Sequence, residues 1–168
     1  NSGGVVQVVG FSQYLKPLTQ TTQDKLNELR KSFDLPPLPN LAMALMPGDP
    51  IIAAWSEEKF GKYASRLYAI LEEEPKASLK DLGDAIDYTV RKIGIDHVGI
   101  SSDFNEGGGV KGWENVGEIR NVTAELISRG YSEADIAKLW GGNFLRVWDQ
   151  VQKAAKPALI SQQDTRQP

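Results

Sequence analysis

The sequence contains no cysteine and a single histidine, His97, among its 168 residues. The lack of cysteine excludes disulfide bonds and every metal or redox site that depends on thiolates. A catalytic zinc site normally takes three protein ligands, and more than one of them is usually histidine. We therefore expect that this chain does not assemble such a site from its own imidazoles. The absence of cysteine is compatible with the cytoplasm and with an exported compartment.

Charge of one sign is not in excess, and long apolar runs are missing. Lysine and arginine number 19, aspartate and glutamate 22, and the net charge is −3, with the basic residues scattered along the chain. This balance argues against a nucleic-acid partner. Because no apolar run approaches the length that crosses a bilayer, we expect no membrane span.

The start of the chain carries no export or initiation signal. It begins at Asn1 rather than Met, with no charged segment ahead of an apolar stretch. We expect the chain to be the interior of a longer polypeptide.

The most informative segment is residues 96–104, followed by the glycine run 107–109. Val98 and Ile100 indicate a short buried strand, and glycines bound it on both sides. Asp103 then falls at the carboxyl end of this strand, where α/β folds place their chemistry. The alternative is that Asp103 only caps the loop that follows.

A second β-branched run, residues 3–11, predicts a central parallel strand covered on both faces, with Ser12, Gln13 and Tyr14 at its carboxyl end. Helices between and after the two strands indicate an α/β fold. Two buried parallel strands cannot form an independent sheet, because their outer edges lack partners. The sequence therefore predicts that further strands, which it does not itself contain, complete the sheet.

Four helical segments follow from the spacing of apolar residues. We expect helices from a cap at Thr21 or Thr22 to about residue 33, over 55–74 with Trp55 and Phe60 in its apolar set, over 79–93 behind a Ser78–Asp81 capping box, and over about 116–129. The prolines of residues 35–50 exclude regular structure there and indicate an excursion over the surface or over a site.

The last helix is expected from the cap residues Ser132 and Asp135 to about residue 155. Gly141, Gly142 and Asn143 indicate a kink, with the Asn143 amide bound to main chain, and Arg146 is expected to pair with a carboxylate. The remaining apolar side chains predict one core-facing stripe: Trp140, Phe144, Val147, Trp148 and Val151. A polar tail follows Pro157.

Other candidates have plainer interpretations. His97 precedes the strand, so we expect a structural or surface role rather than a metal ligand. The glycine run 107–109 lacks the Lys-Ser/Thr of a phosphate loop, so it predicts a mobile lining over the mouth of a site, which Trp113 partly closes.

Two motifs resemble the membrane dipeptidase (renal dipeptidase) family, zinc peptidases of the amidohydrolase type. Residues 97–104 (HVGISSDF) are similar to the family segment HVGIGSDF, and residues 129–147 match its RGYS and GGN-LRV pattern. Residues 3–8 resemble the strand that follows the family's last two histidine ligands. The resemblance implies the carboxyl-terminal part of a (β/α)₈ TIM barrel over residues 1–156, with a tail over 157–168.

The resemblance also implies chemistry. The family's ligands for two zinc ions map upstream of Asn1, so the amino-terminal portion of the same barrel would supply them. Asp103 matches the family aspartate that takes the proton from the metal-bridging hydroxide and passes it to the leaving nitrogen. Tyr14 falls close to a family tyrosine and is carried over as a pocket residue, although a structural aromatic fits it equally well. Asn105 stands where the family often has Asp, beside the substrate, and Ser101 where it usually has Gly.

Three hypotheses follow from the sequence. The first is a zinc-dependent dipeptidase-like metallohydrolase, inactive as this segment alone, that cleaves a dipeptide or a related small amide. The second is a dipeptidase-like protein recruited to mature a peptide secondary metabolite such as a siderophore, and the third is a non-catalytic barrel scaffold. We also expect an exported, periplasmic location, with the cytoplasm as the alternative, and a possible homodimer.

Overall fold

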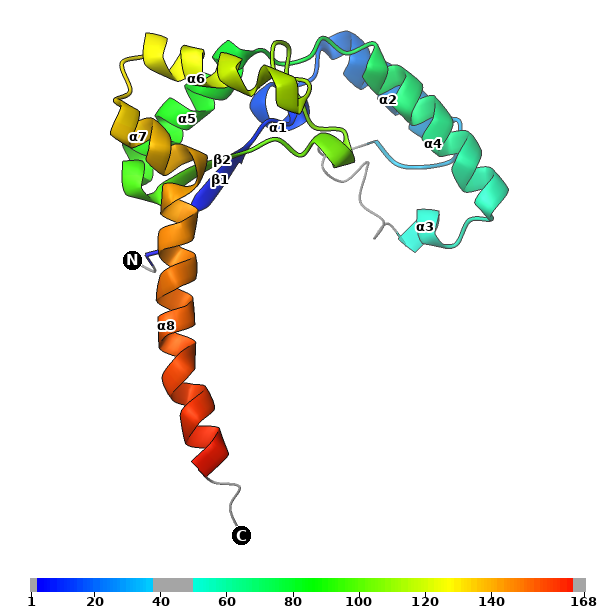
Figure 1. The fold of residues 1–168 in the computed structure, drawn as a ribbon. Helices are drawn as coiled ribbons and strands as arrows, with labels where there is room; N and C mark the ends of the chain where they lie inside the picture. The colour runs from blue at the N-terminus through cyan, green and yellow to red at the C-terminus, as the bar shows by residue number, and fades with distance from the viewer. Residues whose placement is uncertain (1–2, 38–49, 165–168) are drawn as a thin grey trace. The chain divides into compact units, whose positions relative to one another are not determined.

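The computed structural model describes residues 3–37 and 50–164, with the side chains of 106 and 156–164 left out. Within these ranges the fold is a helix-rich α/β arrangement (Figure 1). The chain divides into two compact units, Asn1–Leu15 with Ala77–Pro168, and Lys16–Lys76. We call these unit 1 and unit 2. The extent of a single barrel domain, residues 1–156, stays a prediction.

Unit 1 contains both predicted strands, and they pair. Strand β1 (Val6–Val9) runs parallel to β2 (Val98–Ser101), with Val6 opposite Val98 and Val9 opposite Ser101. Figure 1 shows the two strands side by side. Val8 is buried and Val6 is 53% exposed on the same face of β1, so the expected coverage of β1 on both faces stays a prediction for the complete barrel.

Helix α5 (Leu79–Ile93) packs on both strands and begins as predicted. Ser78 and Asp81 form the full capping box, and Gly94 ends the helix with a φ of 87° that favours glycine. Its Leu82 and Ile86 are almost fully buried in the core of unit 1. The other buried residues of this core come from the two strands, the loop after β2, the later helices and the residue before the capping box of α5: Val8, Ala77, Val98, Val110, Trp113, Val122, Leu126, Ile136 and Leu139.

The later helices of unit 1 are α6 (Ile119–Ser128), α7 (Glu133–Ala137) and α8 (Asn143–Asp164), and a π-helical turn over Lys138–Gly142 precedes α8. Ser132 caps α7 as predicted. Helix α8 continues past the expected end near residue 155 and includes Pro157.

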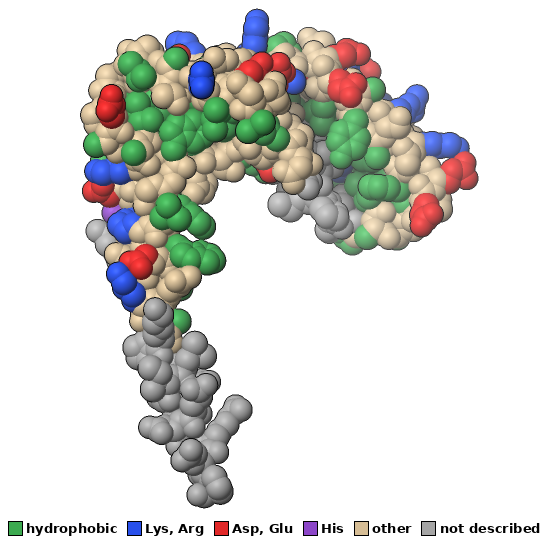
Figure 2. Space-filling view, in the orientation of Figure 1, with side chains coloured by type: hydrophobic (Ala, Val, Ile, Leu, Met, Phe, Trp, Pro, Cys, Tyr) green, Lys and Arg blue, Asp and Glu red, His purple; other side chains and the backbone are tan. Residues whose placement is uncertain are grey.

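Of the predicted apolar stripe, Trp140 packs against the core of unit 1, whereas the part that lies on α8 does not face this core. Phe144, Trp148 and Val151 are 49–61% exposed, and Figure 2 shows hydrophobic side chains along the described part of this helix. The start of α8 is anchored, since Asn143 is buried and donates to the carbonyls of Ile95 (2.7 Å) and Val98 (2.8 Å). The kink and the amide contact are therefore confirmed, and the orientation of the stripe is corrected.

Unit 2 is built on helices α2 (Gln20–Lys31) and α4 (Glu57–Glu72), with the short α3 (Pro50–Ala53) between them. The cap of α2 is Thr19, not Thr21 or Thr22. Its core contains Leu26, Leu29, Leu35, Ile52, Tyr63 and Leu67. Phe60, expected among these residues, is instead 51% exposed in the first turn of α4. Most of the proline-rich stretch lies outside the described residues.

No helix in the described ranges combines the length and the apolar character that crossing a bilayer requires.

Candidate active site

The carboxyl ends of the two strands lie together and carry the candidate residues. The Gly10 N–H donates to the Ser101 carbonyl at 2.7 Å, so β1 and β2 end side by side. The chain after β1 continues into the short helix α1 (Ser12–Leu15), and the chain after β2 reaches Asp103. Because the strands are parallel, the polar residues that follow β1 and β2 lie at the same end of the sheet.

Asp103 occupies an unusual backbone conformation. Its φ of 59° and ψ of 29° lie in the left-handed region, which aspartate and asparagine tolerate better than other side chains. The side chain is half-buried. Within the described part of the chain its carboxylate has neither a hydrogen bond nor an ion pair, so it does not act as the loop cap that was the alternative. It is a carboxylate held in place by its backbone.

The glycine run has a different role from the predicted mobile lining. The Gly108 N–H donates to the Asp103 carbonyl at 2.8 Å, and the Gly109 N–H donates to the Gly10 carbonyl at 2.6 Å. Gly107 and Gly109 have φ values of 86° and 117°, which favour glycine. These glycines therefore make a tightly bonded turn that joins the ends of both strands.

Ser12, which the sequence placed at the carboxyl end of the first strand without a role, supports the same turn. Its hydroxyl donates to the Gly109 carbonyl at 3.4 Å and accepts from the Ala77 N–H at 3.1 Å. It thus connects α1, the glycine turn and the residue before the capping box of α5. The available signal was its position directly after a strand that ends in Gly-Phe.

Tyr14 and Asn105 lie at this end of the sheet as well. Tyr14, on α1, is 70% exposed, and its ring lies 4.9 Å from that of Phe11 between centroids. Asn105 is exposed within the 3₁₀ turn Phe104–Glu106. Among the described residues, neither side chain hydrogen-bonds to Asp103, and their roles as pocket residues stay predictions.

Trp113 does not close the mouth of the site. Its side chain is only 2% exposed and packs edge-on against Phe104 and Trp140, with ring centroids 5.3 and 5.9 Å away. It belongs to the core below the loop that carries Asp103, so the prediction for Trp113 is wrong.

The opposite end of the sheet is held by structural contacts. His97 lies at the amino end of β2, as predicted, where its Nδ1 is 2.8 Å from the Gly4 carbonyl oxygen. Arg146 donates to the carbonyls of Gly3 (3.2 Å) and Asp96 (2.8 Å), not to a carboxylate as expected. Main-chain carbonyls from both strand entries converge there and attract the guanidinium.

A cluster of ion pairs lies between α5 and α6. Arg129 donates to Glu125, Asp84 and Asp87 at 2.7–2.9 Å. Burial opposes the charge of Arg129, yet these hydrogen bonds outweigh it and raise its pKa. Burial, followed by the hydrogen bond to Asp87, raises the pKa of Tyr131. These groups join two helices, and among the described residues none of them hydrogen-bonds to Asp103.

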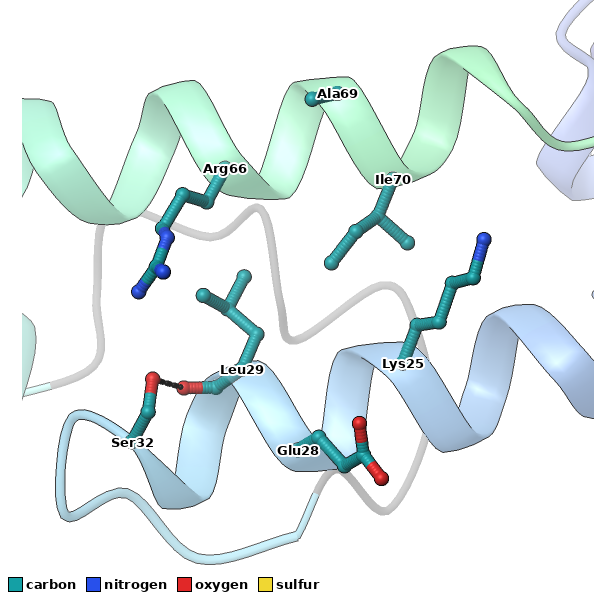
Figure 3. A pocket seen from close by; sticks show the side chains of 7 residues that line it. All are labelled: Lys25, Glu28, Leu29, Ser32, Arg66, Ala69 and Ile70. Carbon is teal, nitrogen blue, oxygen red and sulfur yellow. Dashed lines mark hydrogen bonds between the residues drawn. The ribbon is translucent and has the colours of Figure 1, made fainter.

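One open hollow of about 400 Å³ lies in unit 2 between α2 and α4 (Figure 3). Lys25, Glu28 and Arg66 line it together with small and apolar side chains, and Lys25 pairs with Glu73. It contains none of the candidate residues. Among the described residues, no three His, Asp or Glu side chains gather into a potential metal site.

Comparison with known proteins connects most of the chain to one family. The model of the family described as "Membrane dipeptidase (Peptidase family M19)" matches residues 1–162. The crystal structure of the probable dipeptidase PvdM from Pseudomonas aeruginosa is 74% identical and superposes with a TM-score of 0.83. This match covers 90% of the present chain and 38% of that chain.

Curated fungal relatives match over shorter stretches. Dipeptidase aclJ of Aspergillus oryzae is 39% identical over 53% of this chain and 21% of its own length. Dipeptidase ataJ of Aspergillus terreus is 44% identical over 43% of this chain and 18% of its own length. In these alignments the chain spans about a fifth of the length of its curated relatives.

Proposed function

This chain belongs to the membrane dipeptidase family, and we propose that it forms the carboxyl-terminal part of a dipeptidase-like hydrolase. The substrate in this proposal is a dipeptide or a related small amide. The chain contributes strands and helices to a (β/α)₈ barrel, and Asp103 acts at the carboxyl ends of the strands, where barrel enzymes have their active sites.

The observation that supports this proposal most directly is the state of Asp103. A half-buried carboxylate without a partner among the described residues, in a left-handed conformation, stabilises nothing in its surroundings. Burying a carboxylate without a partner costs folding free energy, so packing alone does not account for an acid at this position. A role in proton transfer explains why an acid stands at this position.

Asp103 moves one proton in the proposed reaction. Water attacks the carbonyl carbon of the scissile amide, and the Asp103 carboxylate accepts the proton that the water loses. The C–N bond then breaks, and Asp103 returns this proton to the leaving nitrogen, which departs as an amine. The acid and base steps therefore balance on one side chain, and Asp103 ends the cycle ionised.

Two zinc ions are expected from the family resemblance, but the described residues of this chain do not fit their site. The carboxylates and the single histidine do not come together, and His97 is engaged by the Gly4 carbonyl. In this proposal the amino-terminal portion of the barrel holds the metals.

The experiment is to replace Asp103 by Asn in the complete protein and to measure dipeptide hydrolysis with zinc supplied. Asparagine keeps the size of the side chain and tolerates the left-handed backbone, so the fold is preserved. We expect kcat to fall by about 10²–10⁴-fold, the usual contribution of a general acid–base group.

The matched control is Asp96→Asn, because Asp96 is an exposed aspartate at the other end of the same strand. It pairs with Lys138 at 2.8 Å, and this hydrogen bond lowers its pKa. We expect Asp96→Asn to keep full activity. Equal activity of wild type and Asp103→Asn would remove Asp103 from the mechanism.

Completion of the barrel by another part of the polypeptide is supported by two surfaces of unit 1. Within the described ranges, β1 and β2 form a two-stranded sheet, so each strand has one edge without a neighbour. The exposed stripe of α8 adds a second uncovered apolar surface, with Trp148 56% exposed. We propose that further strands and helices of the complete protein cover both.

Trp148→Glu in the complete protein tests this proposal. If the stripe is covered there, a buried charge destabilises the fold by several kcal/mol. Tyr88→Glu is the matched control, since Tyr88 is a similarly exposed aromatic (58%) on the outer face of α5. Equal, small losses of stability in urea for both variants would contradict the covered stripe.

The alternative substrate is a maturing peptide metabolite, and the alternative to catalysis is a scaffold. Exposed Asn105, where the family often has Asp, removes a negative charge beside the proposed site and supports a modified specificity. Rapid turnover of free dipeptides by the complete protein would disfavour the metabolite. Absence of zinc from the purified complete protein, together with no turnover, would favour the scaffold.

A further inference from the structure

The turn after β2 closes directly on the main chain of Asp103. The Gly108 N–H donates to the Asp103 carbonyl at 2.8 Å. Between these two residues the chain passes through the 3₁₀ turn Phe104–Glu106 and the left-handed Gly107. The Asp103 peptide is thus clamped by a residue five positions later.

Gly108 makes this clamp possible because it has no side chain. A Cβ at residue 108 would lie 2.2 Å from the Ser102 carbonyl oxygen and 2.5 Å from that of Asp103. Contacts below 3.0 Å essentially never occur for a real Cβ, and both neighbours are main-chain atoms that cannot rotate away. Any larger residue therefore has to move the chain by at least the missing 0.8 Å.

The other side of the clamp is fixed as well. The Gly109 N–H donates to the Gly10 carbonyl at 2.6 Å, and the Ser12 hydroxyl contacts the Gly109 carbonyl. The turn is therefore fastened to the end of β1. A displacement at residue 108 cannot be absorbed there and is transmitted to Asp103.

We propose that Gly108 is the positioning residue of Asp103: its bare main chain fixes the Asp103 peptide and so the direction of the carboxylate. This inference rests on the proposed role of Asp103 in proton transfer. It explains why the left-handed conformation persists at a residue without any side-chain partner in the described part of the chain.

The test is Gly108→Ala in the complete protein, with dipeptide kinetics and thermal unfolding measured together. We expect kcat to fall by about a hundredfold, as for a misplacement of roughly 1 Å, while KM changes by less than about threefold. Gly112→Ala is the matched control. Gly112 lies in the same connection and has a φ of 95°, but its Cβ would meet Leu79 instead of Asp103. We expect it to lower stability and to keep kcat.

The double variant Gly108→Ala/Asp103→Asn separates positioning from folding. If Gly108 acts through the carboxylate, the double variant is no slower than Asp103→Asn alone. Ser12→Ala serves as a second variant, should Gly108→Ala not fold. It loosens the same turn without added bulk, and we expect a smaller fall in kcat that also vanishes when it is combined with Asp103→Asn.

The outcomes distinguish the two proposals. Full activity of Asp103→Asn refutes the proposed function. A large loss with Asp103→Asn but normal kcat with Gly108→Ala refutes only the positioning role. Equal losses of kcat in Gly108→Ala and Gly112→Ala, or additive losses in the double variant, would also overturn it.

Discussion

Replacing Gly83 by alanine tests the packing between α5 and α6. Glycine in the middle of a helix costs about 0.5–1 kcal/mol relative to alanine, so helix propensity alone predicts stabilisation. The structure predicts the opposite. A Cβ at residue 83 would lie 2.3 Å from Nε and 2.4 Å from Cζ of Arg129, whose guanidinium lies over the glycine.

The magnitude follows from what holds Arg129 there. Its guanidinium donates to Glu125 and Asp87 at 2.7 Å, and its side chain is only 15% exposed. To make room for a Cβ at residue 83, the Arg129 guanidinium has to move by about 1 Å. This movement breaks at least one of its charge-assisted hydrogen bonds, each of which contributes about 1.5–3 kcal/mol to stability. After subtraction of the gain in helix propensity, we expect Gly83→Ala to destabilise by about 1–2 kcal/mol.

The assay is urea unfolding of the complete protein, followed by far-ultraviolet circular dichroism. Gly61→Ala is the control, because Gly61 also lies inside a helix, α4, and its Cβ would meet no atom within 4 Å. We expect this variant to gain about 0.5–1 kcal/mol. In an Arg129→Ala background Gly83→Ala should become neutral or stabilising. Stabilisation by Gly83→Ala in the wild type, or persistent destabilisation without Arg129, would refute the steric reasoning.

Three further predictions concern single side chains of unit 1. Asn143→Ala leaves two main-chain acceptors without their donor, so we expect a loss of about 2–4 kcal/mol in urea. The exposed Asn121, with one such bond, should lose less than about 1 kcal/mol on the same change, and equal losses would contradict the reasoning. The hydrogen bonds from Lys80 and then Arg129 lower the pKa of Asp84, so its contribution to stability is present above its unfolded value near about pH 4 and is lost as the pH falls through its lower folded value. Asp84→Asn should therefore narrow the difference in melting temperature between about pH 7 and pH 3, and an unchanged difference would argue against the ion pair. Asn105→Asp restores the family's usual charge, so we expect KM to rise for acidic dipeptides relative to neutral ones at similar kcat, and unchanged ratios would remove Asn105 from the substrate's surroundings.

Local signals in the sequence were sufficient to predict many of the helices and strands of unit 1. The capping box of Ser78 and Asp81 and the cap at Ser132 are fixed by residues three positions apart, so a short window contains all the information. The strand that leads to Asp103 was equally readable, because β-branched residues and flanking glycines mark it. The left-handed conformation of Asp103 was not, since no local pattern marks it and its carbonyl is bonded to Gly108, five residues later.

The wrong predictions share one physical cause. The spacing of residues along the sequence shows which side chains lie on one face, but not which other segment that face contacts. The apolar stripe on α8 was recognised, but its spacing says only that one face avoids water. Arg146 and Trp113 were misjudged for a related reason, because their partners come from distant segments. For the glycine run, a missing Cβ is compatible with mobility and with close packing, and only the contacts distinguish the two.

The hydrogen bonds between Thr19 and Glu74 in unit 2 bear on the entropic cost of pairing β1 with β2. Strands β1 and β2 are neighbours in space, yet all of unit 2 lies between them in sequence. The main-chain N–H and hydroxyl of Thr19 donate to the Glu74 carboxylate at 2.9 and 2.8 Å, which ties the two ends of the inserted segment together. If the Thr19–Glu74 contact forms before the strands pair, the flexible chain between β1 and β2 becomes shorter by more than half. The entropic cost of pairing the two strands then falls by about 1 kcal/mol. Insertions or deletions at the far end of the inserted segment would accordingly leave the pairing of β1 with β2 almost unaffected.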